Sequence, residues 1–267
     1  MGGDLPQRLV PDDPWAWVEP VLPSFRSRPQ GGGTAPVGQR AVFTAVVYVP
    51  TSGCAWRYLP PTFGLSSATA HRRFSIWTAS GVRRRLHRVI LDEIGAHSGL
   101  DWSSVIVDAV SVRAKGSAGG AESGRPGQSS QQTTRSDGSA EAAPGVGVSA
   151  ANVNDVQALG PLVPGIPAIR SRRDPRRRRP EKVRADKAYH SAGNLTWLRE
   201  RNITPRIARP GVEHSERFRR HRWKIQRSIS RLFGYRRLAV RHERKGSHFL
   251  GLAAAMTYYK KLAKVTT

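Results

Sequence analysis

Apolar and polar positions in the first hundred residues alternate with a helical period, interrupted by short turn-forming stretches. A short helix is expected to begin at Asp12 or Asp13, either of which can cap it. The next apolar run predicts a helix that ends near Pro50, and residues 63–95 hold two further helical segments. This pattern predicts a helical region over residues 1–99.

The first of the two segments within 63–95 has a pattern that is compatible with DNA binding. Ser66 is a favourable N-cap, and Ser80-Gly81 separates this segment from the next. The expected exposed face carries Thr69, Arg72 and Arg73, and the expected buried face carries Ala70, Phe74 and Trp77. A short three-helix unit of this kind is typical of helix-turn-helix proteins, whose helix enters a major groove. A plain core helix is an equally good interpretation.

Beyond residue 100 the pattern changes to short apolar runs that predict strands and helices in alternation. The run at 105–107 leads into Asp108, and "KVRA" leads into Asp186. Later segments predict a strand, a turn and a helix over 146–166, with Asp155 as the cap, then a helix over 192–202 and an extended segment over 203–208. Residues 116–145 contain Gly, Ser, Gln and Ala with almost nothing apolar, which is typical of a linker or a disordered segment.

The charge of the chain indicates its partner. Lys and Arg number 44 against 19 Asp and Glu, which gives a formal charge of +25. Nucleic acid is the leading partner because neutralised phosphates release counterions. An acidic membrane surface fits poorly, since the sequence has neither a long uncharged apolar run nor a signal-peptide pattern. Cys54 is the only cysteine, which excludes a disulfide framework and predicts a soluble intracellular protein.

Two stretches hold much of the basic charge, residues 170–180 and residues 216–245. The first contains two prolines and is compatible with a solvated loop as well as with a functional contact. The second interleaves its arginines with Phe218, Trp223, Phe233 and Tyr235. This pattern predicts a helix that packs on one side and faces phosphates on the other.

Asp108 and Asp186 share a setting, because each ends or follows a short strand and precedes basic residues. Adjacent strands of one sheet would bring the two carboxylates together, where they repel unless a divalent cation lies between them. Hard oxygen ligands select Mg²⁺ or Mn²⁺, and such ions promote phosphodiester chemistry. Two capping or ion-paired aspartates are the alternative interpretation.

Several motifs occur in the order found in a known family. The runs "RADKAYHS", "RHRWKIQRSISRLFGYRRLAVRHER" and "FLGLAAA" closely resemble the second half of bacterial insertion-sequence transposases of the DDE type. The segments "VIVDAVSVRAKG" and "SAANVNDVQAL" are similar to the matching earlier segments, and "WRYLPPTFGLSSATAHRRFSIWTASGVRRRL" resembles the N-terminal helical DNA-binding region. The match covers about residues 10–115 and 146–262.

This resemblance implies an α/β fold in which an RNase H-like core, a mixed sheet with flanking helices, occupies residues 100–267. It also implies a metal-binding acidic triad in which Asp108 is the first acid and Asp186 the second. The chain departs from the family at Gln226, which stands where the family has the glutamate of its "W.vER" motif. A glutamine brings no negative charge and no base to the site.

A second departure lies in the segment at 117–144, which is expected to be disordered or reads like a shifted frame. The family has a strand and hairpin of the core sheet here, whereas "QSSQQTTRSDGSAEAAPG" at 128–145 lacks the apolar residues for a buried face. The sheet is therefore expected to be one strand short.

The leading hypothesis from these features is a transposase that binds the terminal inverted repeats of its element and cuts and joins DNA with Mg²⁺ or Mn²⁺. It would act in the cytoplasm at the nucleoid, away from membranes, with a homodimer on DNA as one expected assembly. A catalytically impaired remnant that only binds DNA is the alternative, and a basic nucleoid or RNA-associated protein is a third. Tyr189 and His190 are interpreted as packing and loop residues. The candidate DNA-contacting residues are His71, Arg72, Arg73, Arg222, Arg227, Arg236 and Arg237.

Overall fold

The computed structural model describes residues 9–24, 37–97, 101–114, 128–136, 145–150, 153–170, 175–211, 238, 240–243, 245–249 and 251–252. Only the backbone is described for residues 97, 108–114, 128–136, 146, 148–150 and 240–241. The described chain divides into two compact units. The first comprises 9–90 with 238 and 247–252, and the second comprises 91–211 with 240–246. The sequence-based boundary at 99/100 differs from this division, which falls within a helix.

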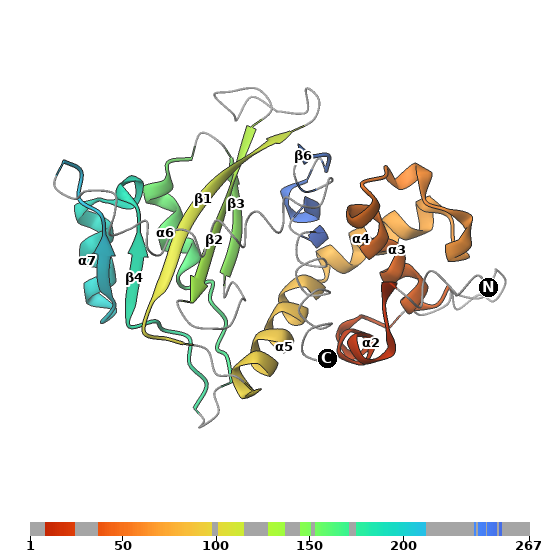
Figure 1. Ribbon diagram of the computed structural model, residues 1–267, viewed down its shortest axis with the longest axis horizontal. Helices are drawn as coiled ribbons and strands as arrows, with labels where there is room; N and C mark the ends of the chain where they lie inside the picture. The colour runs from red at the N-terminus through yellow and green to blue at the C-terminus, as the bar shows by residue number, and fades with distance from the viewer. Residues whose placement is uncertain are drawn as a thin grey trace. The chain divides into compact units, whose positions relative to one another are not determined.

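The first unit is helical, as its period predicts. Its elements are α2 (Asp12–Val18), η1 (Glu19–Val21), α3 (Gln39–Ser52), η2 (Trp56–Tyr58), η3 (Pro61–Phe63), α4 (Ser67–Ala79) and the first half of α5 (Val82–His97) (Figure 1). The predicted cap of α2 is wrong, because the N-cap is Pro11 and both aspartates lie in the first turn. Asp12 instead accepts a hydrogen bond from Arg40 Nη1 at 2.6 Å, which ties α2 to α3.

The core of the first unit is built on α3. Nearly every residue from Val42 to Pro50 is buried, so this helix is surrounded by protein rather than amphipathic. The helix passes through Pro50 and ends two residues later at Ser52, and Gly53, with a φ of 76°, forms a left-handed cap after it. A cluster of Ala45, Phe63 and Ala70 joins α3, η3 and α4.

α4 begins and ends as the sequence predicts. The Ser66 side chain accepts a hydrogen bond from the Thr69 backbone N–H at 3.2 Å, which confirms the predicted N-cap. Gly81, at a φ of 75°, separates α4 from α5 in the predicted place. Ala70, Phe74 and Trp77 are buried, as expected.

The second unit contains a mixed sheet with flanking helices. Its strands are β1 (Val105–Ala114), β2 (Gln128–Ser136), β3 (Gly145–Ala150), β4 (Lys182–Ala185), β5 (Thr204–Ile207) and β6 (Val240–Arg241), and its helices are α6 (Asp155–Leu162), η4 (Lys187–Tyr189) and α7 (Ala192–Glu200).

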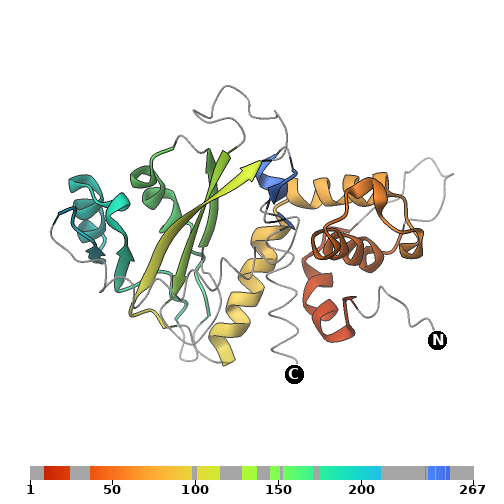
Figure 2. The same cartoon turned by 45° about the horizontal axis from the view of Figure 1, so that its top comes forward.

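The strand order is β3-β2-β1-β4-β5, and β6 pairs with β1 beyond β4 (Figures 1 and 2). β1 runs antiparallel to β2 and parallel to β4, and β4 runs parallel to β5. α6 packs on β2 and β3, and α7 packs on β5. This is the mixed sheet with flanking helices that the resemblance implies.

The expectation that the sheet lacks a strand is wrong. Gln128–Ser136 forms β2, which pairs with β1 from Val105↔Ser136 to Arg113↔Gln128 and with β3 on its other side. Backbone hydrogen bonds to two neighbouring strands satisfy this segment without an apolar sequence. The rest of the segment expected to be disordered, 117–127 and 137–144, lies outside the described residues.

The second unit also corrects the predicted start of α6. The Asn154 side chain, not that of Asp155, caps α6 by accepting a hydrogen bond from the Val156 N–H at 3.0 Å. The predicted helix over 192–202 corresponds to α7, and the predicted extended segment over 203–208 contains β5. Over the described parts of the chain, no helix has both the length and the apolar composition needed to cross a bilayer.

Candidate active site

The two candidate acids follow directly after paired positions on adjacent parallel strands. β1 and β4 pair in the order Val105↔Val183, Ile106↔Arg184 and Val107↔Ala185, so the next residues along the two strands are Asp108 and Asp186. Asp186 has an extended backbone, with φ −76° and ψ 177°, and thus continues the direction of β4. Neighbouring strands lie about 4.8 Å apart, so the backbones of the two aspartates are close.

The setting of Asp108 differs from the expectation that it ends a strand. β1 continues to Ala114, so Asp108 lies inside β1, at the level where β4 ends. The three residues before it, Val105, Ile106 and Val107, are each 0% exposed. Because Asp108 follows this buried run on the middle strand of the sheet, its backbone is held in a defined position.

Asp186 is half-buried and caps the short helix η4. Its Oδ1 accepts a hydrogen bond from the Ala188 N–H at 2.9 Å. A carboxylate has about four lone-pair sites, so one such bond orients the group without exhausting its capacity to bind a cation. The capping role that the sequence left open for Asp186 is therefore present, and it is compatible with a ligand role.

Asn194 fixes the loop that follows Asp186. Its Nδ2 donates hydrogen bonds to the carbonyl oxygen of Tyr189 at 2.9 Å and to that of Val156 at 3.0 Å. Tyr189 is 1% exposed, which confirms that it is a packing residue, and His190 lies in the loop before α7. Asn194 thus links η4, α6 and α7 behind Asp186, a role that the sequence pattern did not indicate.

The three candidate DNA residues of α4 have different surroundings. Arg72 is exposed, but Arg73 is only 4% exposed, so the expectation that both share an exposed face is wrong. Burial lowers the pKa of Arg73, and the neighbouring Arg72 lowers it further. His71 is half-buried and its ring contacts those of Trp56 and His248, with centroids at 5.3 and 5.8 Å.

The remaining candidates, Gln226 with Arg222, Arg227, Arg236 and Arg237, lie outside the described residues. The aromatic and basic pattern of 216–245 therefore stays a prediction over most of its length. Residues 171–174 of the other basic stretch also lie outside them.

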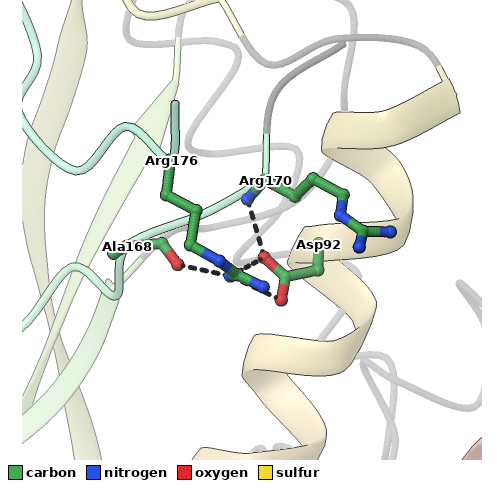
Figure 3. A network of polar contacts seen from close by, with 4 residues as sticks. All are labelled: Asp92, Ala168, Arg170 and Arg176. Carbon is green, nitrogen blue, oxygen red and sulfur yellow. Dashed lines mark hydrogen bonds and ion pairs between the residues drawn. The ribbon is translucent and has the colours of Figure 1, made fainter. Parts of the chain in front are cut away.

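The described part of the 170–180 stretch is held by the protein itself. Arg176 Nη1 lies 2.8 Å from both carboxylate oxygens of Asp92 on α5 and donates to the Ala168 carbonyl at 3.1 Å (Figure 3). The Arg170 N–H donates to the same Asp92 carboxylate at 2.7 Å (Figure 3). Further along, Arg177 forms an ion pair with Glu181 at 3.8 Å. These contacts show that part of the basic run serves to anchor a loop on α5.

Two protein-family models match the chain in succession. The first, described as "Putative transposase of IS4/5 family (DUF4096)", matches residues 10–87, and the second, described as "Transposase DDE domain", matches residues 103–259. The second match spans more than half of the chain and includes both Asp108 and Asp186. The chain belongs to the DDE transposase family.

Two proteins of Burkholderia cepacia are similar to this transposase. One is "Insertion element IS402 uncharacterized 16.2 kDa protein", which is 37% identical over 110 residues, 40% of this chain and 75% of that protein. The other is "Putative transposase for insertion sequence element IS402", which is 36% identical over 143 residues, 52% of this chain and 66% of that protein. The RNase H-like core expected from the motifs agrees with the family and with the mixed sheet.

Proposed function

We propose that this transposase binds the terminal inverted repeats of an insertion sequence and cuts and joins DNA strands with a divalent cation, Mg²⁺ or Mn²⁺. Asp108 and Asp186 would hold the cation, with Gln226 at the position of the third acid. The observation that carries this proposal is the pairing of β1 with β4, which puts the two aspartates at neighbouring positions.

The chemistry of these residues fits such a cation. Carboxylate oxygens are the hard ligands that Mg²⁺ and Mn²⁺ prefer, and two carboxylates on adjacent strands repel in the absence of positive charge. The Asp186 carboxylate accepts one backbone hydrogen bond, which leaves lone pairs for a metal. When bound, the cation would polarise the phosphodiester and lower the pKa of an attacking water.

The chain itself would supply position and charge. Asp108 lies on β1, which pairs with β2 at this position and with β4 up to the residue before it. Asp186 is oriented by its hydrogen bond at the start of η4, and Asn194 holds the loop that follows it. The neutral amide of Gln226 can offer its carbonyl oxygen as a metal ligand. It cannot accept a proton from the attacking water or balance the charge of the metal. We therefore infer a site with two acids and reduced catalytic power.

The proposed partner is double-stranded DNA, at both the element ends and the target, in the cytoplasm where the nucleoid lies. A net charge of +25 supports this partner, because basic proteins gain affinity from counterion release. A homodimer on DNA is part of the proposal, since an element has two ends to be brought together. Arg72 remains a proposed contact, as do Arg222, Arg227, Arg236 and Arg237.

The test is strand cleavage of a labelled duplex that carries the inverted repeat flanking the gene, with Mg²⁺ or Mn²⁺. Asp108→Asn and Asp186→Asn keep the shape of the side chain but remove its charge, and each should lower the rate about 10²–10³-fold or more. The affinity for Mn²⁺, measured by electron paramagnetic resonance, should be lower in the same variants. Asp101→Asn is the matched control. The Asp101 carboxylate accepts a hydrogen bond from the Ser103 N–H before β1 begins, so this substitution should leave the cleavage rate and Mn²⁺ binding unchanged.

The outcome that contradicts the proposal is equal Mn²⁺ binding and equal cleavage in the wild type, Asp108→Asn and Asp186→Asn. If the wild type and Gln226→Glu both bind the duplex but never cut it, the chain is a DNA-binding remnant instead.

A further inference from the structure

The first half of α5 carries a concentration of positive charge that the site above does not use. Its first seven residues include four arginines, and no acid occurs in the helix before Asp92. The four arginines are Arg83, Arg84, Arg85 and Arg88.

The burial pattern of α5 turns this charge outward. Val82, Leu86 and Ile90 are 7%, 3% and 3% exposed, and their spacing of four residues makes one buried stripe. At 100° per residue, Arg84 and Arg88 lie opposite that stripe, and Arg85 lies between the two sides. Arg84, Arg85 and Arg88 are all exposed, in agreement with this geometry.

The Arg84 side chain is held near the start of the helix. A Cβ built on Gly81 would lie 3.5 Å from Arg84 Nη2 and 3.7 Å from its Nε, so the guanidinium lies over the turn between α4 and α5. The backbone N–H groups of Arg84 and Arg85 both donate to the Gly81 carbonyl oxygen, at 3.0 and 3.3 Å. Neither side chain forms an ion pair with another residue in the part of the chain that the structure describes.

The preceding helix is a poorer surface for phosphates. The exposed positions Ala68, Arg72 and Ile76 follow one another at intervals of four residues along α4 and include a single charge. Ile76 is 44% exposed, so part of this face is apolar. The exposed face of α5 is therefore strongly basic, whereas that of α4 is partly apolar and carries one charge.

We propose that Arg84 and Arg85, with Arg88 one turn further on, bind the phosphate backbone of duplex DNA and make α5 the main phosphate-contacting helix of the N-terminal unit. The proposal rests on the proposed function and adds the surface that holds the DNA. Arg84 and Arg88 are separated by about 6 Å along the helix axis. Duplex DNA carries one charge per about 1.7 Å of its axis, so each arginine can neutralise its own phosphate.

The experiment measures the affinity of the full chain for a fluorescein-labelled 20-base-pair duplex by fluorescence anisotropy at several NaCl concentrations. The slope of log K against log [NaCl] changes by about 0.9 for each phosphate contact. R84A/R85A should therefore flatten the slope by about two and weaken binding at low salt. R84K/R85K keeps both charges and should retain the wild-type slope, which separates loss of charge from loss of structure.

The control removes two exposed arginines from the second unit, in R199A/R209A. An unchanged slope in R84A/R85A, or an equal flattening in R199A/R209A, would overturn the assignment to α5. So would a loss confined to single-stranded RNA of the same length, with duplex DNA binding intact.

This result can be told apart from failure of the proposed function. Asp186→Asn should bind the duplex with the wild-type salt slope while losing cleavage. R84A/R85A should regain wild-type cleavage at saturating protein. If Asp186→Asn cleaves normally while R84A/R85A shows the flatter slope, the metal site is wrong and the α5 surface stands.

Discussion

Gln226 is the residue at which we propose that this chain departs from the acidic triad of its family. A third carboxylate would balance metal charge and help to fix a second cation, and a neutral amide does neither fully. Gln226→Glu should raise Mg²⁺-dependent cleavage about 10²–10³-fold, since one well-placed electrostatic group is typically worth about 3–4 kcal/mol. Single-turnover cleavage of the terminal-repeat duplex measures the change.

The increase in cleavage rate from Gln226→Glu should depend on Asp108 and Asp186. In an Asp108→Asn background, Gln226→Glu should restore little or nothing, because a single added carboxylate cannot replace the strand-borne ligand. A wild-type chain that already cleaves efficiently, with no response to Gln226→Glu, would mean that another residue supplies the third ligand.

Also at the residue scale, the position of Asp186 after a strand could be predicted from the sequence, whereas the predicted exposure of Arg73 is wrong. Asp186 follows a short strand that the apolar alternation of "KVRA" marks, so its position could be predicted. Arg73 lies three residues after Ala70 and four before Trp77, so the helical period itself places it on the buried stripe. Its charge led to the opposite expectation, although long basic side chains can bury their aliphatic stems.

At the scale of elements, the attachment of the loop residues 168–170 to α5 depends on a glycine. A Cβ on Gly95 would lie 2.1 Å from the Arg170 carbonyl oxygen, a distance that real side chains do not tolerate. Gly95→Ala should therefore displace this loop and disturb the Asp92 hydrogen bonds. We expect the free energy of unfolding to fall by about 1–3 kcal/mol in urea denaturation, despite the better helix propensity of alanine.

Gly193→Ala is the matched control, because that glycine also lies in a helix of the second unit and nothing is within 4 Å of its would-be Cβ. It should be neutral or stabilise by up to about 1 kcal/mol. A Gly95→Ala chain as stable as the wild type would show that the backbone at Arg170 can move away at little cost.

The elements themselves were predictable where local signals were strong. The cap at Ser66, the break at Gly81 and the strand before Asp186 are all encoded within a few residues. β2 was missed because its Gln, Ser and Thr residues carry no apolar alternation, and its pairing with β1 and β3 is a non-local property. The Asp92–Arg176 contact was missed for the same reason, since 84 residues separate its partners.

At the scale of the whole molecule, the charge of +25 acts on stability and on DNA binding in opposite directions. Like charges on one chain repel, which destabilises the folded state, while the same charges attract phosphates. The screening length falls from about 30 Å at 0.01 M salt to about 10 Å at 0.1 M. Added salt therefore weakens both the internal repulsion and the attraction to DNA.

We accordingly expect the Tm of the free protein to rise by several degrees between 10 and 100 mM NaCl, while its affinity for a short duplex falls steeply. At 10 mM NaCl, a saturating duplex should itself raise the Tm, because a ligand at about 100 times its Kd stabilises by roughly 2.7 kcal/mol. That increase should shrink as salt is added. Differential scanning fluorimetry with and without duplex measures the three effects on Tm, and the decrease of the duplex-induced rise with salt reports the loss of affinity. A Tm of the free protein that falls with salt would contradict this expectation. It would show that attraction between the acids and the basic side chains, as in the ion pairs of Asp92 and Glu181, outweighs the repulsion among the basic side chains.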